Sequence, residues 1–150
     1  MFKNILVAID GSEHGQKAAR LAGDMARSLQ ADLWVVVAYD PLPRYLGQPN
    51  LQEAMFARLA YTDEIMNAGL RDIGAMPGKL TKEVLEGPPA EAILAVAESR
   101  QADLIIMGTR GLSRLAGLLI GSQSQKVIAQ ANCPVMLVHD FAKATLQPYK

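Results

Sequence analysis

Short apolar segments alternate with longer amphipathic ones along the whole chain. Four of the short segments are continuously apolar, which is typical of strands covered on both faces. They comprise residues 5–9, 33–38, 104–107 and 135–138. A fifth segment, residues 79–85, alternates apolar and polar positions and is predicted to be an edge strand. The pattern therefore predicts five strands.

Between these segments, apolar residues recur every three or four positions, as on the buried face of a helix. The four faces predicted in this way are Ala18, Leu21, Ala22, Met25, Ala26 and Leu29; Met55, Leu59, Met66, Leu70 and Ile73; Ala90, Ile93, Leu94 and Ala97; and Val127, Ile128 and Ala131. Pro88 and Pro89 suit the first turn of the third helix, and Pro134 ends the fourth.

Regular alternation of strand and helix indicates parallel strands joined by right-handed crossovers. We therefore expect an α/β fold, an open five-stranded parallel sheet with helices on both faces, formed as one domain over residues 1–150. Residues 41–50 contain three prolines and interrupt the pattern. This stretch is either a lid or simply a connection.

The composition narrows the class of protein. Half of the 150 residues are apolar and 20% are charged, and the 15 basic and 15 acidic residues cancel. A balanced charge argues against nucleic-acid binding. A single cysteine forms no internal disulfide and suits a reducing compartment. No segment approaches the roughly 20 apolar residues of a membrane span. We expect a soluble, cytoplasmic protein.

The segment GTRGLSRLAGLLIGS, residues 108–122, places glycines and hydroxyl side chains at both ends of a mostly leucine centre. Glycines let an oxyanion approach backbone N–H groups closely. The N–H groups and dipole of the first turn of the fourth helix would attract the same anion. The donors predicted to clasp a polyphosphate are Gly108, Arg110, Gly111, Gly121, Ser122, Gln123 and Ser124, with residues 112–120 packed as a hydrophobic flap. The alternative is structural: a glycine helix C-cap followed by a serine N-cap.

Asp10 follows the first strand directly. If the first and fourth strands are neighbours, Asp10 faces Gly108 across one crevice, and its carboxylate is placed to accept hydrogen bonds from a ribose. The alternative is an Asx turn into the first helix, which Gly11 and Ser12 also suit.

Other chemistry is not indicated. The chain has neither the P-loop nor the Rossmann glycine pattern. His14, His139 and Cys133 lack the spacing of zinc ligands, so no metal site is predicted, and Cys133 is interpreted as a small buried residue. Ser12 is interpreted as a helix N-cap rather than a nucleophile. We predict no catalytic residues.

Several of these segments together resemble the universal stress protein family. They are residues 3–12 (KNILVAIDGS), Val84-x-x-Gly87-x-Pro89, residues 103–108 (DLIIMG) and residues 132–138 (NCPVMLV). The similarity covers nearly the whole chain, with residues 41–77 diverging freely. The spacing Gly108-x2-Gly111-x9-Gly121-Ser122 matches the ATP-binding motif of the nucleotide-binding branch of that family.

The resemblance implies the strand order 3-2-1-4-5, which makes the first and fourth strands neighbours. It also implies a site for ATP, with Mg²⁺, formed by Ala8, Ile9, Asp10, Ala38, Met107, Gly108, Arg110, Gly111, Gly121, Ser122, Gln123 and Ser124. Gln123 departs from the small or β-branched residue usual there, and we expect it to contribute its backbone N–H. A homodimer is implied along the fifth strand, from Val135 to His139.

Three functions are compatible with these observations. The favoured one is a stress-response regulatory module that holds ATP as a conformational switch and acts on an unknown protein partner. The second is a slow ATPase or an enzyme that phosphorylates itself on Ser122 or Ser124. Hydrolysis needs a residue that orients water and a well-held metal, and the sequence offers only Asp10. The third is an interaction protein that binds no nucleotide and keeps the motif as helix caps.

Overall fold

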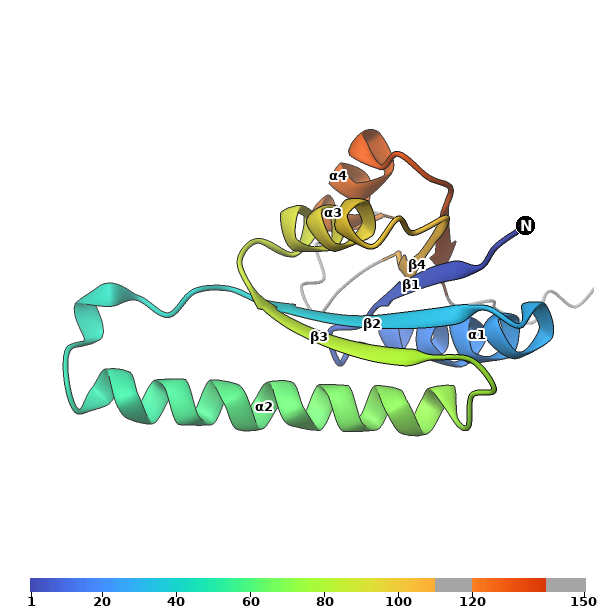
Figure 1. The fold of residues 1–150 in the computed structure, drawn as a ribbon. Helices are drawn as coiled ribbons and strands as arrows, with labels where there is room; N and C mark the ends of the chain where they lie inside the picture. The colour runs from blue at the N-terminus through green and yellow to red at the C-terminus, as the bar shows by residue number, and fades with distance from the viewer. Residues whose placement is uncertain (110–119, 140–150) are drawn as a thin grey trace, which may run out of the picture.

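The computed structural model describes residues 1–109 and 120–139, so Arg110, Gly111 and nearly all of the predicted flap lie outside the described residues. Strands and helices alternate along the chain as predicted (Figure 1). In chain order they are β1 (Asn4–Ala8), α1 (Glu13–Leu29), β2 (Asp32–Tyr39), the 3-10 helix η1 (Arg44–Leu46), α2 (Asn50–Ile73), β3 (Leu80–Glu86), α3 (Pro89–Ser99), β4 (Leu104–Gly108), α4 (Ser122–Gln130) and β5 (Val135–Val138).

The five strands form one parallel sheet in the order β3-β2-β1-β4-β5. This confirms both the predicted sheet and the strand order that the family resemblance implies. β1 lies beside β4 in a register that pairs Ile5 with Leu104 and Ala8 with Met107. The chain order reverses between these two strands, and ligands of open α/β sheets bind outside the carboxyl ends at such a point.

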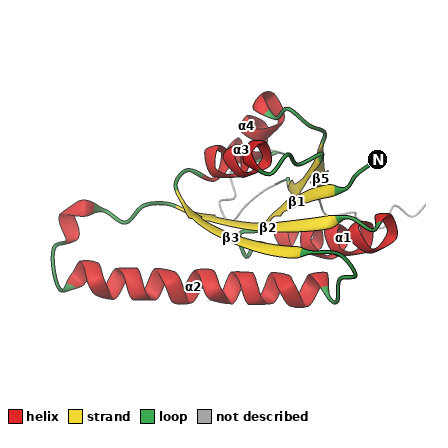
Figure 2. Cartoon of the chain, viewed as in Figure 1, coloured by secondary structure: helices red, strands yellow, loops and turns green. Residues whose placement is uncertain are grey.

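The sheet separates two apolar layers (Figure 2). One face is covered by α1 and α2, whose Ala22, Ala26 and Ile73 are fully buried. The other face is covered by α3 and α4, where Ile93 and Val127 pack toward Leu6 and Ile105 of the sheet. Because side chains alternate along a strand, successive residues of β1 contribute to opposite layers.

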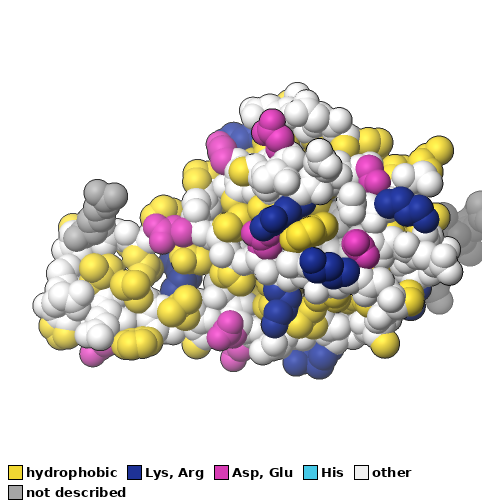
Figure 3. All heavy atoms as spheres, viewed as in Figure 1, with side chains coloured by type: hydrophobic (Ala, Val, Ile, Leu, Met, Phe, Trp, Pro, Cys, Tyr) yellow, Lys and Arg dark blue, Asp and Glu magenta, His cyan; other side chains and the backbone are white. Residues whose placement is uncertain are grey.

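Helix α2 departs from the prediction in its first half. Met66 and Ile73 are buried as expected, but Met55 is 50% exposed and Leu59 is 49% exposed. The first half of α2 extends beyond the end of the sheet, so the sheet does not cover it (Figure 1). Apolar side chains are visible over this extension in the space-filling view (Figure 3).

Helix α4 also buries less of its predicted face. Ser124 and Val127 are its buried residues, whereas Ile128 is 46% exposed. Consecutive helical residues point about 100° apart, so Val127 and Ile128 do not share the narrow face of a helix packed on the edge of a sheet. Among the helices of the described residues, none is both long and apolar enough to cross a membrane.

Candidate functional site

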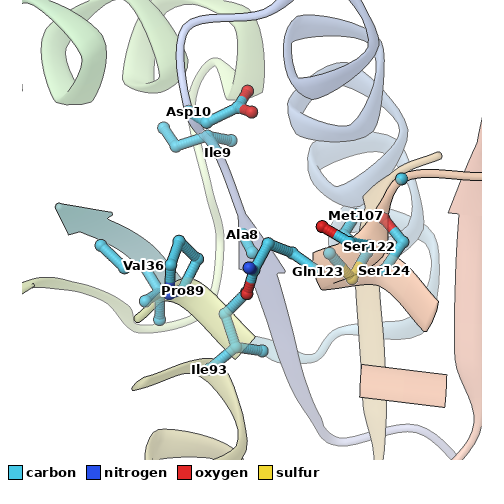
Figure 4. Close-up of a pocket in the computed structure, with 12 residues that line it drawn as sticks. Ala8, Ile9, Asp10, Val36, Pro89, Ile93, Met107, Ser122, Gln123 and Ser124 are labelled. Atoms are coloured by element: carbon cyan, nitrogen blue, oxygen red, sulfur yellow. The ribbon is translucent and has the colours of Figure 1, made fainter. Parts of the chain in front are cut away.

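A cavity lies at the carboxyl ends of β1, β2 and β4, beside the first turns of α3 and α4. Its volume is about 150 Å³. It is lined by Ala8, Ile9, Asp10, Val36, Ala38, Pro89, Ile93, Met107, Gly121, Ser122, Gln123 and Ser124. Figure 4 shows Ile9 and Asp10 beyond the end of β1, and Pro89 and Ile93 on the side of α3. Nine of the twelve predicted site residues therefore line one cavity, drawn together from residues far apart in sequence.

The N-terminus of α4 opens onto this cavity without a side-chain cap. The N-cap residue is Gly121, which makes no side-chain hydrogen bond, and Ser122 is already the first helical residue. The predicted alternative of a serine N-cap is therefore wrong for this helix. The N–H groups of Ser122, Gln123 and Ser124 have no hydrogen-bond acceptor among the described residues. Such free N–H groups, together with the helix dipole, favour an anion.

Helix α1 provides a contrast at the same edge of the sheet. Its N-cap is Ser12, as predicted, and the Ser12 side chain accepts a hydrogen bond from Gly15 N at 3.1 Å. One N–H group of this first turn is therefore satisfied within the chain. The first turn of α4 has no such side-chain cap.

The Asp10 carboxylate takes part in the local turn that the sequence suggested. Its Oδ1 accepts hydrogen bonds from Ser12 N at 2.9 Å and from the Ser12 hydroxyl. This arrangement is an Asx turn, and it fixes the carboxylate at the edge of the cavity. The second oxygen, Oδ2, has no hydrogen-bond donor among the described residues and is available to a ligand.

Gly108 ends β4 where the first turn of α1 crosses the sheet. A Cβ at this position would lie 2.7 Å from His14 Cβ and 3.0 Å from the His14 carbonyl carbon. Glycine is therefore required here by packing, whatever its role toward a ligand. Gly108 does not line the cavity, but its carbonyl accepts a hydrogen bond from the Ser124 hydroxyl at 2.9 Å. Ser124 is 3% exposed, and this buried hydrogen bond connects α4 to β4.

Gln123 makes a contact that the sequence did not suggest. Its side-chain Oε1 accepts a hydrogen bond from Ala90 N at 2.9 Å and so ties the first turn of α4 to the first turn of α3. Helix α3 begins after Pro88, which provides no side-chain cap. The side chain of Gln123, from α4, thus accepts a hydrogen bond from an N–H group that has no acceptor within α3.

Three lining residues were missed by the sequence analysis: Val36, Pro89 and Ile93. Pro88 and Pro89 correctly marked the start of α3, but a helix start does not reveal which neighbour its first turn faces. Val36 lies inside a continuously apolar strand, where sequence gives no distinction between the two faces. Of the predicted residues, Arg110 and Gly111 lie outside the described part of the chain.

The described residues show no cluster of three or more histidine, cysteine, aspartate or glutamate side chains suited to a metal ion. Cys133 was expected to be buried but is only partly so. Burial nevertheless raises the pKa of the Cys133 thiol, and the nearby Asp103 carboxylate raises it further. The thiol is therefore protonated at neutral pH and is a poor nucleophile.

The fold is that of a doubly wound α/β protein with a cavity at the point where the strand order reverses, which is where such folds bind small molecules. The chain belongs to the universal stress protein family, whose model matches residues 1–139. One relative is the universal stress protein in the QAH/OAS sulfhydrylase 3′ region of Thermus aquaticus. It is 47% identical over 140 residues, which cover 92% of this chain and 99% of that protein.

Solved structures agree with this assignment. Universal stress protein UspA from Lactobacillus plantarum superposes with a TM-score of 0.81 at 26% identity, covering 92% of this chain and 98% of that one. A universal stress protein solved in complex with cAMP superposes with a TM-score of 0.68, also at 26% identity, covering 92% of this chain and 97% of that one.

Proposed function

We propose that this protein is an adenine-nucleotide-binding regulatory module whose ligand is ATP. The observation that carries the proposal is the uncapped N-terminus of α4 at the mouth of the cavity. An apolar recess beside a cluster of free N–H groups suits a molecule with an aromatic ring at one end and an anion at the other. The related protein in complex with cAMP supports an adenine nucleotide.

The cavity volume indicates which part of the nucleotide it takes. A space of about 150 Å³ is of the size that holds a single aromatic ring such as benzene. It is too small for a whole nucleoside triphosphate. The base would therefore lie between Ala8, Ile93 and Met107, with the ribose and phosphates extending toward α4.

The polar residues suit the remaining parts of ATP. Asp10 Oδ2 would accept a hydrogen bond from a ribose hydroxyl. The N–H groups of Ser122, Gln123 and Ser124 would receive the phosphates, with Arg110 and Gly111 as their expected partners across the opening. Mg²⁺ is held in many nucleotide sites by the phosphates and one or two carboxylates. Asp10 is the carboxylate that lines this cavity, so Mg²⁺ would enter with the nucleotide.

The regulatory part of the proposal includes a homodimer formed along β5. This strand is one edge of the sheet, and its four residues are all apolar. An uncharged edge strand readily pairs with another copy of itself. Nucleotide binding next to this edge would then alter the surface presented to a protein partner, provided that the ligand binds two conformations with different affinity.

Self-phosphorylation is the second candidate, and the exposure of Ser122 favours it. The Ser122 side chain is exposed at the first position of α4, beside the proposed phosphates. Transfer of the γ-phosphoryl group to its hydroxyl would release ADP and the hydroxyl proton. Ser124 is less suited to this role because its buried hydroxyl already donates to Gly108.

The proposal is tested first by denaturing the purified protein and separating the released small molecules by chromatography. We expect near-stoichiometric ATP. ADP or AMP would keep the site but favour turnover. Release of no nucleotide, combined with no heat of binding when ATP and Mg²⁺ are added, would refute the proposal.

The variant Gly121→Val tests the position of the phosphates. Its side chain would occupy the space in front of the first turn of α4, and we expect ATP binding to be lost. The backbone at Gly121 has φ −69° and ψ 157°, an extended conformation that suits a β-branched residue. The fold should therefore be intact, with an unchanged urea midpoint. Wild-type affinity for ATP in this variant would contradict the proposed phosphate site.

A further inference from the structure

The side chain of Gln123 lies within the cavity, where the proposed function places the base. Its Oε1 is held at 2.9 Å by the N–H group of Ala90, a residue that is 1% exposed in the first turn of α3. The amide therefore lies beside Pro89 and Ile93, on the side of the cavity opposite its own backbone (Figure 4).

The hydrogen bond with Ala90 also determines the positions of the oxygen and the nitrogen of the Gln123 amide. A backbone N–H group needs an acceptor, so the oxygen of Gln123 must face Ala90 and the amino group must face away. The two N–H donors of Nε2 have no acceptor among the described residues. Gln123 thus presents donors of fixed orientation to the interior of the cavity.

The surroundings of this amide make the donors selective. Most of the side chains that line the cavity are apolar: Ala8, Ile9, Val36, Ala38, Pro89, Ile93 and Met107. Of the other polar ones, Ser124 already donates to a carbonyl, Asp10 is an acceptor, and the Ser122 hydroxyl is exposed at the start of α4. Nε2 is not sealed from solvent, since no buried side-chain nitrogen or oxygen of the described residues lacks a partner. A ligand that fills the cavity would displace water from Nε2, and a donor then left without an acceptor is costly, so a ligand that supplies an acceptor is favoured.

We propose that Gln123 determines base specificity, with its Nε2 donating a hydrogen bond to a ring nitrogen of adenine. This inference rests on the proposed function and adds to it. Adenine carries acceptor nitrogens at N1, N3 and N7 on different edges of the ring. An amide of fixed orientation would read one of these positions and disfavour a base that presents C–H or N–H there.

The variant Gln123→Glu tests this proposal with little change in shape. One carboxylate oxygen retains the hydrogen bond from Ala90 N, at a helix N-terminus that favours negative charge. The other oxygen replaces the donors with an acceptor. We expect an unchanged or higher urea midpoint and an affinity for adenosine about 10- to 100-fold lower by calorimetry. Adenosine is the probe because it carries no phosphate for the new charge to repel.

Two controls separate base reading from a general effect of charge. Gln130→Glu adds the same charge at an exposed position in the last turn of α4, away from the cavity, and should leave adenosine affinity unchanged. With the wild-type protein, one of 1-deaza-, 3-deaza- and 7-deazaadenosine should bind about 10- to 100-fold more weakly than adenosine. Gln123→Glu should bind that same analogue at least as tightly as adenosine, because its acceptor oxygen repels the ring nitrogen that the analogue lacks.

The outcomes distinguish this inference from the proposed function. If wild-type protein binds adenosine and all three analogues equally, or if Gln123→Glu binds adenosine as tightly as wild type, base selection by Gln123 is wrong while nucleotide binding stands. If wild-type protein binds neither adenosine nor ATP, the proposed function fails, and base selection fails with it.

Discussion

The two glycines that begin and end the predicted phosphate motif have different structural roles. Gly108 lies against the first turn of α1, where an added Cβ would come within 2.7 Å of His14 Cβ. Gly121 is the N-cap of α4 in an extended conformation open to any residue. The spacing of the motif predicted that an anion approaches the backbone at both glycines. In the structure Gly108 is needed for packing, whereas Gly121 lines the cavity.

Substitution by alanine separates these roles. Gly108→Ala should destabilise the protein by about 1–3 kcal/mol, because α1 must shift to admit the methyl group. Gly121→Ala is the matched control and should unfold at nearly the wild-type urea concentration. Equal urea midpoints for the two variants would show that α1 shifts to admit the methyl group without loss of stability.

The side-chain partners of the cavity residues were less predictable than which residues line the cavity. The motif correctly brought Gln123 and Ser124 to the cavity, because helix starts follow from local sequence signals. The atoms that they contact belong to Ala90 and Gly108. These residues lie 33 and 16 positions away in the chain, and their placement depends on how whole helices pack. No local pattern contains that information.

At the scale of elements, helix α2 shows where hydrophobic periodicity reaches its limit. Its spacing predicted one helix with one apolar face, and the helix is present from Asn50 to Ile73. The face is buried in the second half only, because the sheet beneath it ends. Periodicity reports the direction in which a side chain points along its own helix. It does not report whether another layer is present there.

Alanine substitutions at the two ends of α2 should therefore differ in effect. Ile73 is fully buried, and Ile73→Ala should lower the free energy of unfolding by about 2–5 kcal/mol. Leu59 is 49% exposed, and Leu59→Ala should change it by about 0.5 kcal/mol or less. Urea denaturation of both variants measures the difference. A large loss for Leu59→Ala would indicate that a second chain covers this half of the helix.

At the scale of the whole molecule, the two edges of the sheet differ in chemistry. β3 carries charged residues at Lys82, Glu83 and Glu86, which discourage pairing with another chain. β5 carries none. The order of strands and the identity of both edges were predictable, because alternation of elements and the family resemblance fix the topology. Assembly along β5 remains a prediction.

Proline substitutions in β5 test that assembly. The carbonyls of Pro134 and Val138 accept hydrogen bonds from β4, so the N–H group of Met136 also faces β4, whereas that of Leu137 faces outward. Leu137→Pro should keep the fold but sediment as a monomer, since the outward donor is lost. Met136→Pro should unfold the edge of the sheet. A Leu137→Pro variant that is folded and still dimeric would place the interface elsewhere.

The residues on either side of residues 110–119 are joined to each other by a hydrogen bond. Gly121 N donates to the carbonyl of Thr109 at 2.6 Å, and Thr109 N donates to Val138 of β5 at 2.9 Å. The two ends of the intervening segment are thus fastened to each other and to the sheet. Doubling the length of a loop between fixed ends costs only about 0.6 kcal/mol of closure entropy. Evolution is therefore free to lengthen, shorten or rewrite the segment between these two ends without having to find a new way to fold.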